Sequence, residues 1–133
     1  MATILWLKLG DSMNALKYLS FIVLLVLLSG CDKTDLASFV QQPLTISVFK
    51  AGRPVSERHV LPPSKDHELL SSWLAHHQSG WHSSFVTYAP GVLVTGTNFT
   101  MNIQHSGVII NAGGKQFVRN ADDSDFQFLL HQP

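Results

Sequence analysis

Phe99-Thr100-Met101-Asn102-Ile103-Gln104 indicates the fold class, because apolar and polar side chains alternate through it without a break. A period of two predicts a β-strand, and strict alternation is typical of antiparallel sheets that bury one face and leave the other in water. His105-Ser106-Gly107 can form a turn, after which residues 108–110 return as a neighbouring strand. The segment therefore predicts an antiparallel sheet with one face on a core.

Strand patterns on both sides of this stretch extend the predicted sheet. Residues 44–49 alternate in the same way, and residues 55–61 can return after the turn at Ala51-Gly52-Arg53-Pro54. Pro62-Pro63 then ends the sheet pattern, because proline has no N–H to donate to a ladder. Gly113-Gly114 is the strongest hairpin signal in the chain, since both residues tolerate positive φ. The remaining strand candidates are residues 85–88, 92–94 and 115–119.

One main helix is predicted between these groups of strands. Ser64 suits an N-cap, and Asp66 and Glu68 place negative charge in the first turns, where it complements the helix dipole. We expect the helix to run from Lys65 to about His77 and to end before Gly80. Its apolar stripe, which should pack on the sheet, consists of Leu69, Leu70, Trp73, Leu74 and His77.

The length and the pattern together predict a single small α+β domain over residues 44–133. We expect two layers, an antiparallel sheet of five to six strands with one main helix packed on one face. Asp123 and Asp125 before Phe126 indicate a short closing helix or a final strand. Nine Lys and Arg residues balance nine Asp and Glu residues, so there is no basic face of the kind that nucleic-acid binding requires.

The N-terminal segment has the parts of an export signal. Lys17 precedes an apolar run over residues 18–28, and Ser29-Gly30 supply small side chains before Cys31, the only cysteine of the chain. The run is too short for a membrane-spanning helix, which needs about 20 apolar residues. A lone cysteine also excludes a disulfide within the chain.

Leu28-Ser29-Gly30-Cys31 resembles the lipobox of bacterial lipoprotein precursors, in which the chain is cut just before a lipidated cysteine. The resemblance implies a signal peptide over residues 1–30, lipidation at Cys31 and an acylated tether over residues 31–43. Within this tether Leu36, Phe39 and Val40 could form one turn that docks on the domain. The alternatives are an uncleaved anchor or a chance match. The mature domain itself resembles no family that its motifs identify.

Two further expectations concern the start of the chain and its destination. Asp11 is out of place in a positively charged leader, so we expect Met13 to be the true initiator. Asp32, directly after the cysteine, resembles a sorting signal that retains a lipoprotein on the periplasmic side of the inner membrane. Lys33 departs from that pattern, and the outer membrane remains the alternative.

The segment from Trp81 to Tyr88 is the most distinctive part of the mature chain. Trp81, His82 and Tyr88 could form a partner-binding surface, although Trp81 and Tyr88 could equally belong to the core. Trp73 is expected in the core. We therefore expect a non-enzymatic protein that binds another envelope protein, with an immunity-type lipoprotein as one version. The alternative is a small-ligand binder or hydrolase that uses residues 81–88.

The sequence provides little support for a metal site or a serine nucleophile. The histidines near the helix do not have the spacing of a zinc site, because adjacent residues point about 100° apart on a helix; they are His67, His76, His77 and His82. Ser83 and Ser84 lie near His82 but lack a nucleophile elbow. The sequence therefore predicts no catalytic residue, no metal site and no cofactor.

Overall fold

The computed structural model describes residues 34–130 of the chain. The expected signal peptide, the candidate initiator Met13, the lipidation site Cys31 and the sorting residue Asp32 lie outside the described residues. Among the helices that are described, none is both long and apolar enough to cross a membrane. Residues 34–130 belong to one compact unit.

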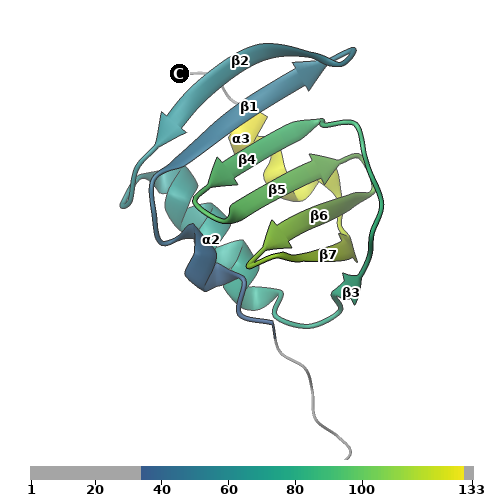
Figure 1. Ribbon diagram of the computed structural model, residues 1–133. Helices are drawn as coiled ribbons and strands as arrows, with labels where there is room; N and C mark the ends of the chain where they lie inside the picture. The colour runs from purple at the N-terminus through teal and green to yellow at the C-terminus, as the bar shows by residue number, and fades with distance from the viewer. Residues whose placement is uncertain (1–33, 131–133) are drawn as a thin grey trace, which may run out of the picture. The chain divides into compact units, whose positions relative to one another are not determined.

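One antiparallel sheet of seven strands organises this unit (Figure 1). The strand order is β2-β1-β4-β5-β6-β7-β3, and every neighbouring pair is antiparallel. The expected antiparallel α+β class is confirmed, but the expected five to six strands are too few. The strands are β1 Leu44–Lys50, β2 Arg53–Val60, β3 His82–Ser83, β4 Val92–Gly96, β5 Phe99–Gln104, β6 Gly107–Ala112 and β7 Lys115–Asn120.

The alternating stretch that opens the sequence pattern is β5, at the centre of the sheet. Its apolar residues are buried and its polar residues are half-exposed, as the pattern predicts. Cross-strand pairing places Ile46, Val94, Met101, Ile110 and Phe117 side by side on the same face. The first four of these are no more than 1% exposed, so this row is the middle of the core.

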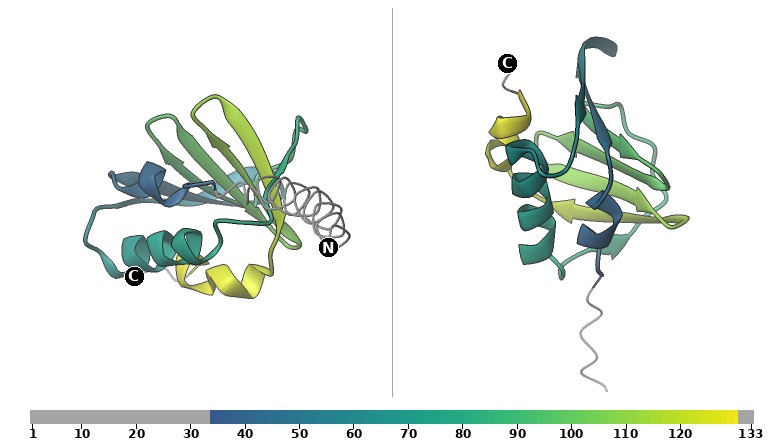
Figure 2. Two further views of the ribbon diagram at one scale, coloured as in Figure 1. Left: turned by 90° about the horizontal axis from the view of Figure 1, so that it is seen from below. Right: turned by 90° about the vertical axis from the view of Figure 1, so that its left-hand side faces the viewer.

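A helical layer covers that face of the sheet (Figure 2). Helix α2 spans Lys65–His76, and the Ser64 side chain accepts a hydrogen bond from the backbone N–H of His67, which confirms the predicted cap. Leu70 and Leu74 are 1% exposed, whereas Leu69 is 38% exposed and lies outside the buried stripe predicted for it. The Trp73 ring packs against Phe126, at a centroid distance of 4.7 Å.

The helical layer contains more than the single main helix that the sequence predicts. A 3-10 helix, η2, spans Asp123–Phe126 and continues into the short helix α3 at Gln127–Leu130. The Asp122 side chain caps η2 by accepting a hydrogen bond from the backbone N–H of Ser124 at 2.9 Å. Phe126 and Leu129 are each 1% exposed. The closing segment is therefore helical, and it adds two large side chains to the core.

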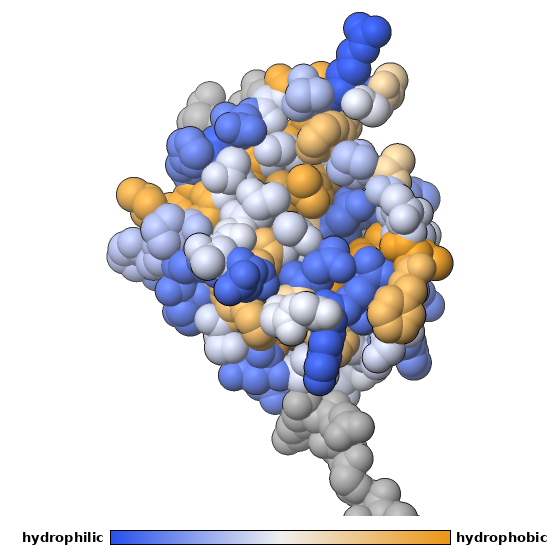
Figure 3. Space-filling view, in the orientation of Figure 1, coloured by the Kyte–Doolittle hydropathy of each residue, from blue (hydrophilic) through white to orange (hydrophobic). Residues whose placement is uncertain are grey.

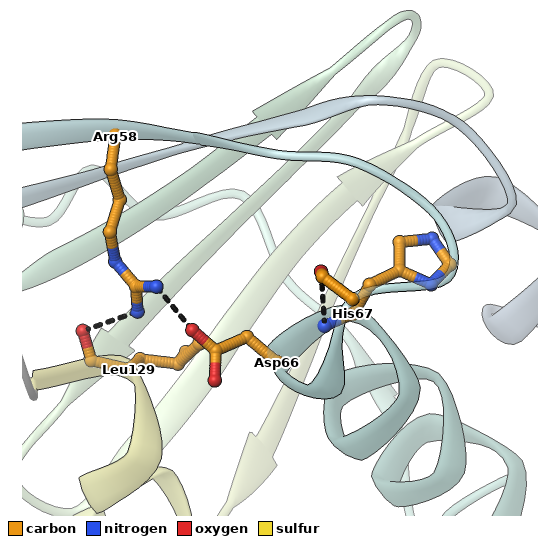
Figure 4. Close-up of polar contacts among 5 residues, drawn as sticks. Arg58, Asp66, His67 and Leu129 are labelled. Carbon is orange, nitrogen blue, oxygen red and sulfur yellow. Dashed lines mark hydrogen bonds and ion pairs between the residues drawn. The ribbon is translucent and has the colours of Figure 1, made fainter. Parts of the chain in front are cut away.

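Three elements meet at a polar clamp (Figure 4). Arg58 on β2 forms an ion pair with Asp66 in the first turn of α2. The same guanidinium donates to the carbonyl of Leu129 in α3 at 3.1 Å. Because each side chain of the ion pair is about one-quarter exposed, the pair is partly shielded from solvent. The clamp therefore fixes the edge strand to both helices.

The part of the expected tether that the structure describes packs onto the domain. A 3-10 helix, η1, spans Ala37–Val40. Leu36 and Val40 are at most 1% exposed, so the docked turn expected there is present. The His67 ring, 4% exposed, contacts the Val40 carbonyl through Nε2 at 2.5 Å. Residues from Leu36 onward therefore belong to the folded domain.

Candidate functional site

The face of the sheet opposite the helices is open and mainly polar (Figure 3). Side chains from neighbouring strands bond to one another across it. The amide Nδ2 of Asn111 on β6 donates to Oγ1 of Thr100 on β5 at 3.1 Å. Gln116 on β7 donates through Nε2 to Oδ1 of Asn111 at 3.0 Å. These bonds hold the polar side chains in fixed positions on a rigid sheet.

A strap, residues 84–91, connects β3 to β4 along one edge of this face (Figure 1). The strand expected at residues 85–88 is absent, and that prediction was wrong. The strap bonds largely to side chains of the sheet instead of to a neighbouring strand. Its bonds are Ser84 N to Gln116 O (3.3 Å), Val86 N to Gln116 Oε1 (2.9 Å), Gln104 Nε2 to Ala89 O (2.5 Å), Gly91 N to Asn102 Oδ1 (3.3 Å) and Phe49 N to Gly91 O (2.8 Å).

The strap carries an exposed apolar ridge, Phe85-Val86-Thr87-Tyr88. Phe85 is 97% exposed, Val86 43% and Tyr88 40%. Figure 3 shows a hydrophobic patch at the right-hand edge of the open face, where the strap runs in Figure 1. Scattered single apolar residues are ordinary on a protein surface, but neighbouring ones on a single segment are typical of an interaction site.

A shallow hollow lies between the strap and the open face of the sheet. Its volume is about 320 Å³, and it is lined by uncharged residues from both sides, Val86, Thr87, Tyr88, Pro90, Leu93, Thr100, Asn102, Ile109, Asn111 and Gln116. The Asn102 amide oxygen is engaged by the strap, so its Nδ2 is the donor left to face the hollow. The hollow suits an uncharged group, because it offers hydrogen bonds and no ionic partner.

The structure separates the three residues proposed as a partner-binding surface. Trp81 is half-buried against the core, its indole N–H donates to the His77 carbonyl at 2.6 Å, and its ring meets Trp73 edge-on. His82 is exposed on β3, and Tyr88 lies on the ridge. The binding surface predicted from the sequence did not include Phe85. Its position between Ser83-Ser84 and the Ala89-Pro90-Gly91 bend could have indicated an exposed aromatic residue, because such flanks are typical of a surface loop.

The histidines serve separate local contacts. In the described part of the chain, no three His, Cys, Asp or Glu side chains gather as a metal site would require. His76 and His77 each place Nδ1 at 2.7 Å from the carbonyl four residues earlier. Over residues 34–130, neither Ser83 nor Ser84 hydrogen-bonds to His82. The geometry therefore offers neither a metal centre nor an activated serine among these residues.

An ion pair between His105, which directly follows β5, and Asp123 shifts the pKa of the histidine. The side chain of Asp123 accepts from Nδ1 of His105 at 2.9 Å, and this hydrogen bond raises the pKa of His105. The backbone N–H of Ser124 lowers the pKa of the neighbouring Asp122. His105 is 93% exposed, so the pair is a surface feature and is screened by salt.

Comparison with known proteins adds no relative to this geometry. No family model, no curated protein and no solved structure matches the chain. Because no relative suggests a function, the function is inferred from the ridge and the hollow of the described domain.

Proposed function

We propose that this chain is a lipid-anchored envelope protein that works without catalysis, by binding another envelope protein through the ridge at residues 85–88. The observation that carries this proposal is the near-complete exposure of Phe85, 97%, beside two further exposed apolar side chains. Neutralisation of an incoming toxin, as an immunity-type protein does, is one form that such binding can take.

The energetics of the ridge favour a partner. Burial of apolar surface contributes about 25 cal/mol per Å², and an aromatic side chain buries about 150–250 Å². Phe85 contributes almost none of this to folding, so nearly all of it remains available for binding. The strap is bonded to the sheet on both sides of the ridge, at Ser84 and at Gly91, which limits the entropy lost on association.

The proposed location rests on the leader. Acylation at Cys31 would hold the domain on a membrane, since two acyl chains suffice for stable attachment where one is marginal. Asp32 favours the periplasmic side of the inner membrane, with the outer membrane as the alternative destination. The membrane is thus one partner, through lipid, and the envelope protein that meets the ridge is the other.

Site-specific photocrosslinking in cells tests the proposal. A benzoylphenylalanine at Tyr88, on the ridge, should give a discrete adduct in the membrane fraction. Phe85→Ser should weaken the interaction by about 2 kcal/mol, roughly 30-fold in Kd, and should abolish the adduct. Leu61→Ser is the matched control, because Leu61 is 59% exposed but lies outside the ridge. An adduct that survives Phe85→Ser, or is equally lost in Leu61→Ser, would contradict a role for the ridge.

The hollow supports a second candidate, the binding of a small uncharged ligand. Its volume of about 320 Å³ is at the lower end of ligand pockets, and its lining holds no charged residue. Asn102→Leu would remove the free amide donor together with the Gly91 contact. If this candidate is correct, a neutral ligand that raises the Tm of the native protein should fail to do so in this variant.

A further inference from the structure

The first described residues are held against the C-terminal end of α2. The backbone N–H of Thr34 donates to the carbonyl of Gln78 at 3.0 Å. Two residues later, Leu36 is 1% exposed and begins the docked turn. The chain therefore enters the domain at a fixed point, next to the loop that follows α2.

The chain between that point and the cysteine is very short. Asp32 and Lys33 alone separate Cys31 from Thr34, so three peptide units join them. Fully extended, three units span about 11 Å. A domain of about 100 residues has a radius of gyration of about 13 Å, so this reach is shorter than the domain is wide. A lipid on Cys31 would therefore leave only one end of the domain able to meet the bilayer.

We propose that the anchor-proximal corner, residues 78–82 together with Arg119, is the surface that lies against the phospholipid headgroups. This placement rests on the proposed acylation of Cys31. Arg119 on β7 ties the corner together, because its guanidinium donates to the Ser79 carbonyl. The same guanidinium lies 6.0 Å from the centroid of the Trp81 ring. A Cβ on Gly80 would come within 2.7 Å of Nη1 of Arg119, so the loop and the guanidinium are closely packed.

The side chains of the corner match a headgroup region. Trp81 is half-buried and its indole N–H donates to the His77 carbonyl, so exposed Ser79 and His82 and half-exposed Arg119 are the side chains that would meet the headgroups. Arginine pairs with phosphate oxygens through its planar fork of donors. None of the six corner residues is acidic. The nearest carboxylate in sequence to Thr34, Asp35, accepts from the backbone N–H of Ser38 at 3.3 Å.

This placement has a consequence for the partner. The strap begins at Ser84, two residues beyond the corner, and runs away from it toward β4 (Figure 1). The ridge at residues 85–88 would therefore stand directly above the headgroups, whereas the turn between β1 and β2 lies at the opposite end of the molecule. A partner that meets the ridge must present its own binding segment close to the membrane surface.

Depth-dependent quenching on the acylated protein tests the placement. If Cys31 carries lipid, an introduced cysteine is the sole free thiol. Ser79→Cys labels the corner, and Val55→Cys, at a residue 51% exposed near the β1–β2 turn, is the matched distant site. Each variant is labelled with NBD and reconstituted in phosphatidylethanolamine and phosphatidylglycerol vesicles that contain a headgroup nitroxide lipid. We expect severalfold stronger quenching at position 79 than at position 55.

The outcomes separate the placement from the anchor. Acylated protein, verified by intact mass, that shows equal quenching at both positions would overturn the placement alone. A mass without acyl chains would overturn the proposed anchoring, and the placement with it. A Gly/Ser insertion of about twelve residues before Thr34, which adds about 20 Å of reach, should remove most of the contrast between the two positions. Persistence of the full contrast in that variant would show that the short connection does not set the orientation.

Discussion

Replacement of Leu36 by alanine tests whether the segment before β1 is part of the domain or a free tether. Leu36 precedes the first strand by eight residues, yet its side chain is 1% exposed within the core. A residue in a solvated tether would tolerate this change with almost no cost. A residue that fills the core loses the transfer free energy of the removed methyl groups and leaves a cavity behind.

We expect Leu36→Ala to lower the free energy of unfolding by about 3 kcal/mol, within the range of about 2–5 kcal/mol for buried Leu→Ala changes. A domain of this size is stable by about 5–15 kcal/mol, so the change would remove a substantial fraction of the total. Urea unfolding of the chain from Asp32 onward measures it. With m of about 1.5 kcal/mol/M, the midpoint should fall by about 2 M.

Leu61→Ala is the matched control, because the same truncation is made at a side chain that is 59% exposed. It should alter the free energy of unfolding by less than about 0.5 kcal/mol. The reasoning is refuted if Leu36→Ala costs no more than this control. A change in m without a shift in midpoint would likewise point to the unfolded state rather than to the core.

Three further predictions concern polar contacts. Arg58→Met should cost about 1–2 kcal/mol in urea unfolding, and less at high salt, because its ion pair is partly shielded and its bond to α3 is charge-assisted. His67→Ala should cost about 1–3 kcal/mol, since the buried carbonyl of Val40 loses the contact from the ring. NMR titration should find that the pKa of His105 is raised in the native protein and is close to its usual value in Asp123→Asn. Because the folded-state pKa is raised, the pair stabilises the fold at low pH, and this contribution is lost as pH rises through that pKa.

Local sequence patterns were sufficient to predict those elements whose signal lies in a few neighbouring residues. The alternation in β5 predicted both the strand and its buried face, because side chains on a pleated strand point to opposite sides in turn. The Ser64 cap predicted the start of α2 to the residue. Gly113-Gly114 predicted a hairpin, and both residues adopt positive φ there, +55° and +77°.

The candidate site was predicted in outline only. The sequence identified the segment from Trp81 to Tyr88 as distinctive, but its composition could not show which of its aromatic residues are buried and which are exposed. Trp81 faces the core because its ring packs edge-on against Trp73 and its indole N–H donates to the His77 carbonyl. Phe85 is exposed because sheet side chains such as Gln116 hold the strap at the edge. Both outcomes depend on residues that are distant in sequence.

Neighbouring residues were enough to predict the antiparallel sheet and the start of the main helix, since periodicity and caps are local properties. The lipobox-like leader stays a prediction. Only the packing of distant segments showed that Phe85 on the strap is exposed and that Leu69 is 38% exposed. The physical reason is that burial is set by whatever packs against a side chain from elsewhere in the chain. A stretch of sequence specifies which of its faces is apolar, but not which surface will cover that face.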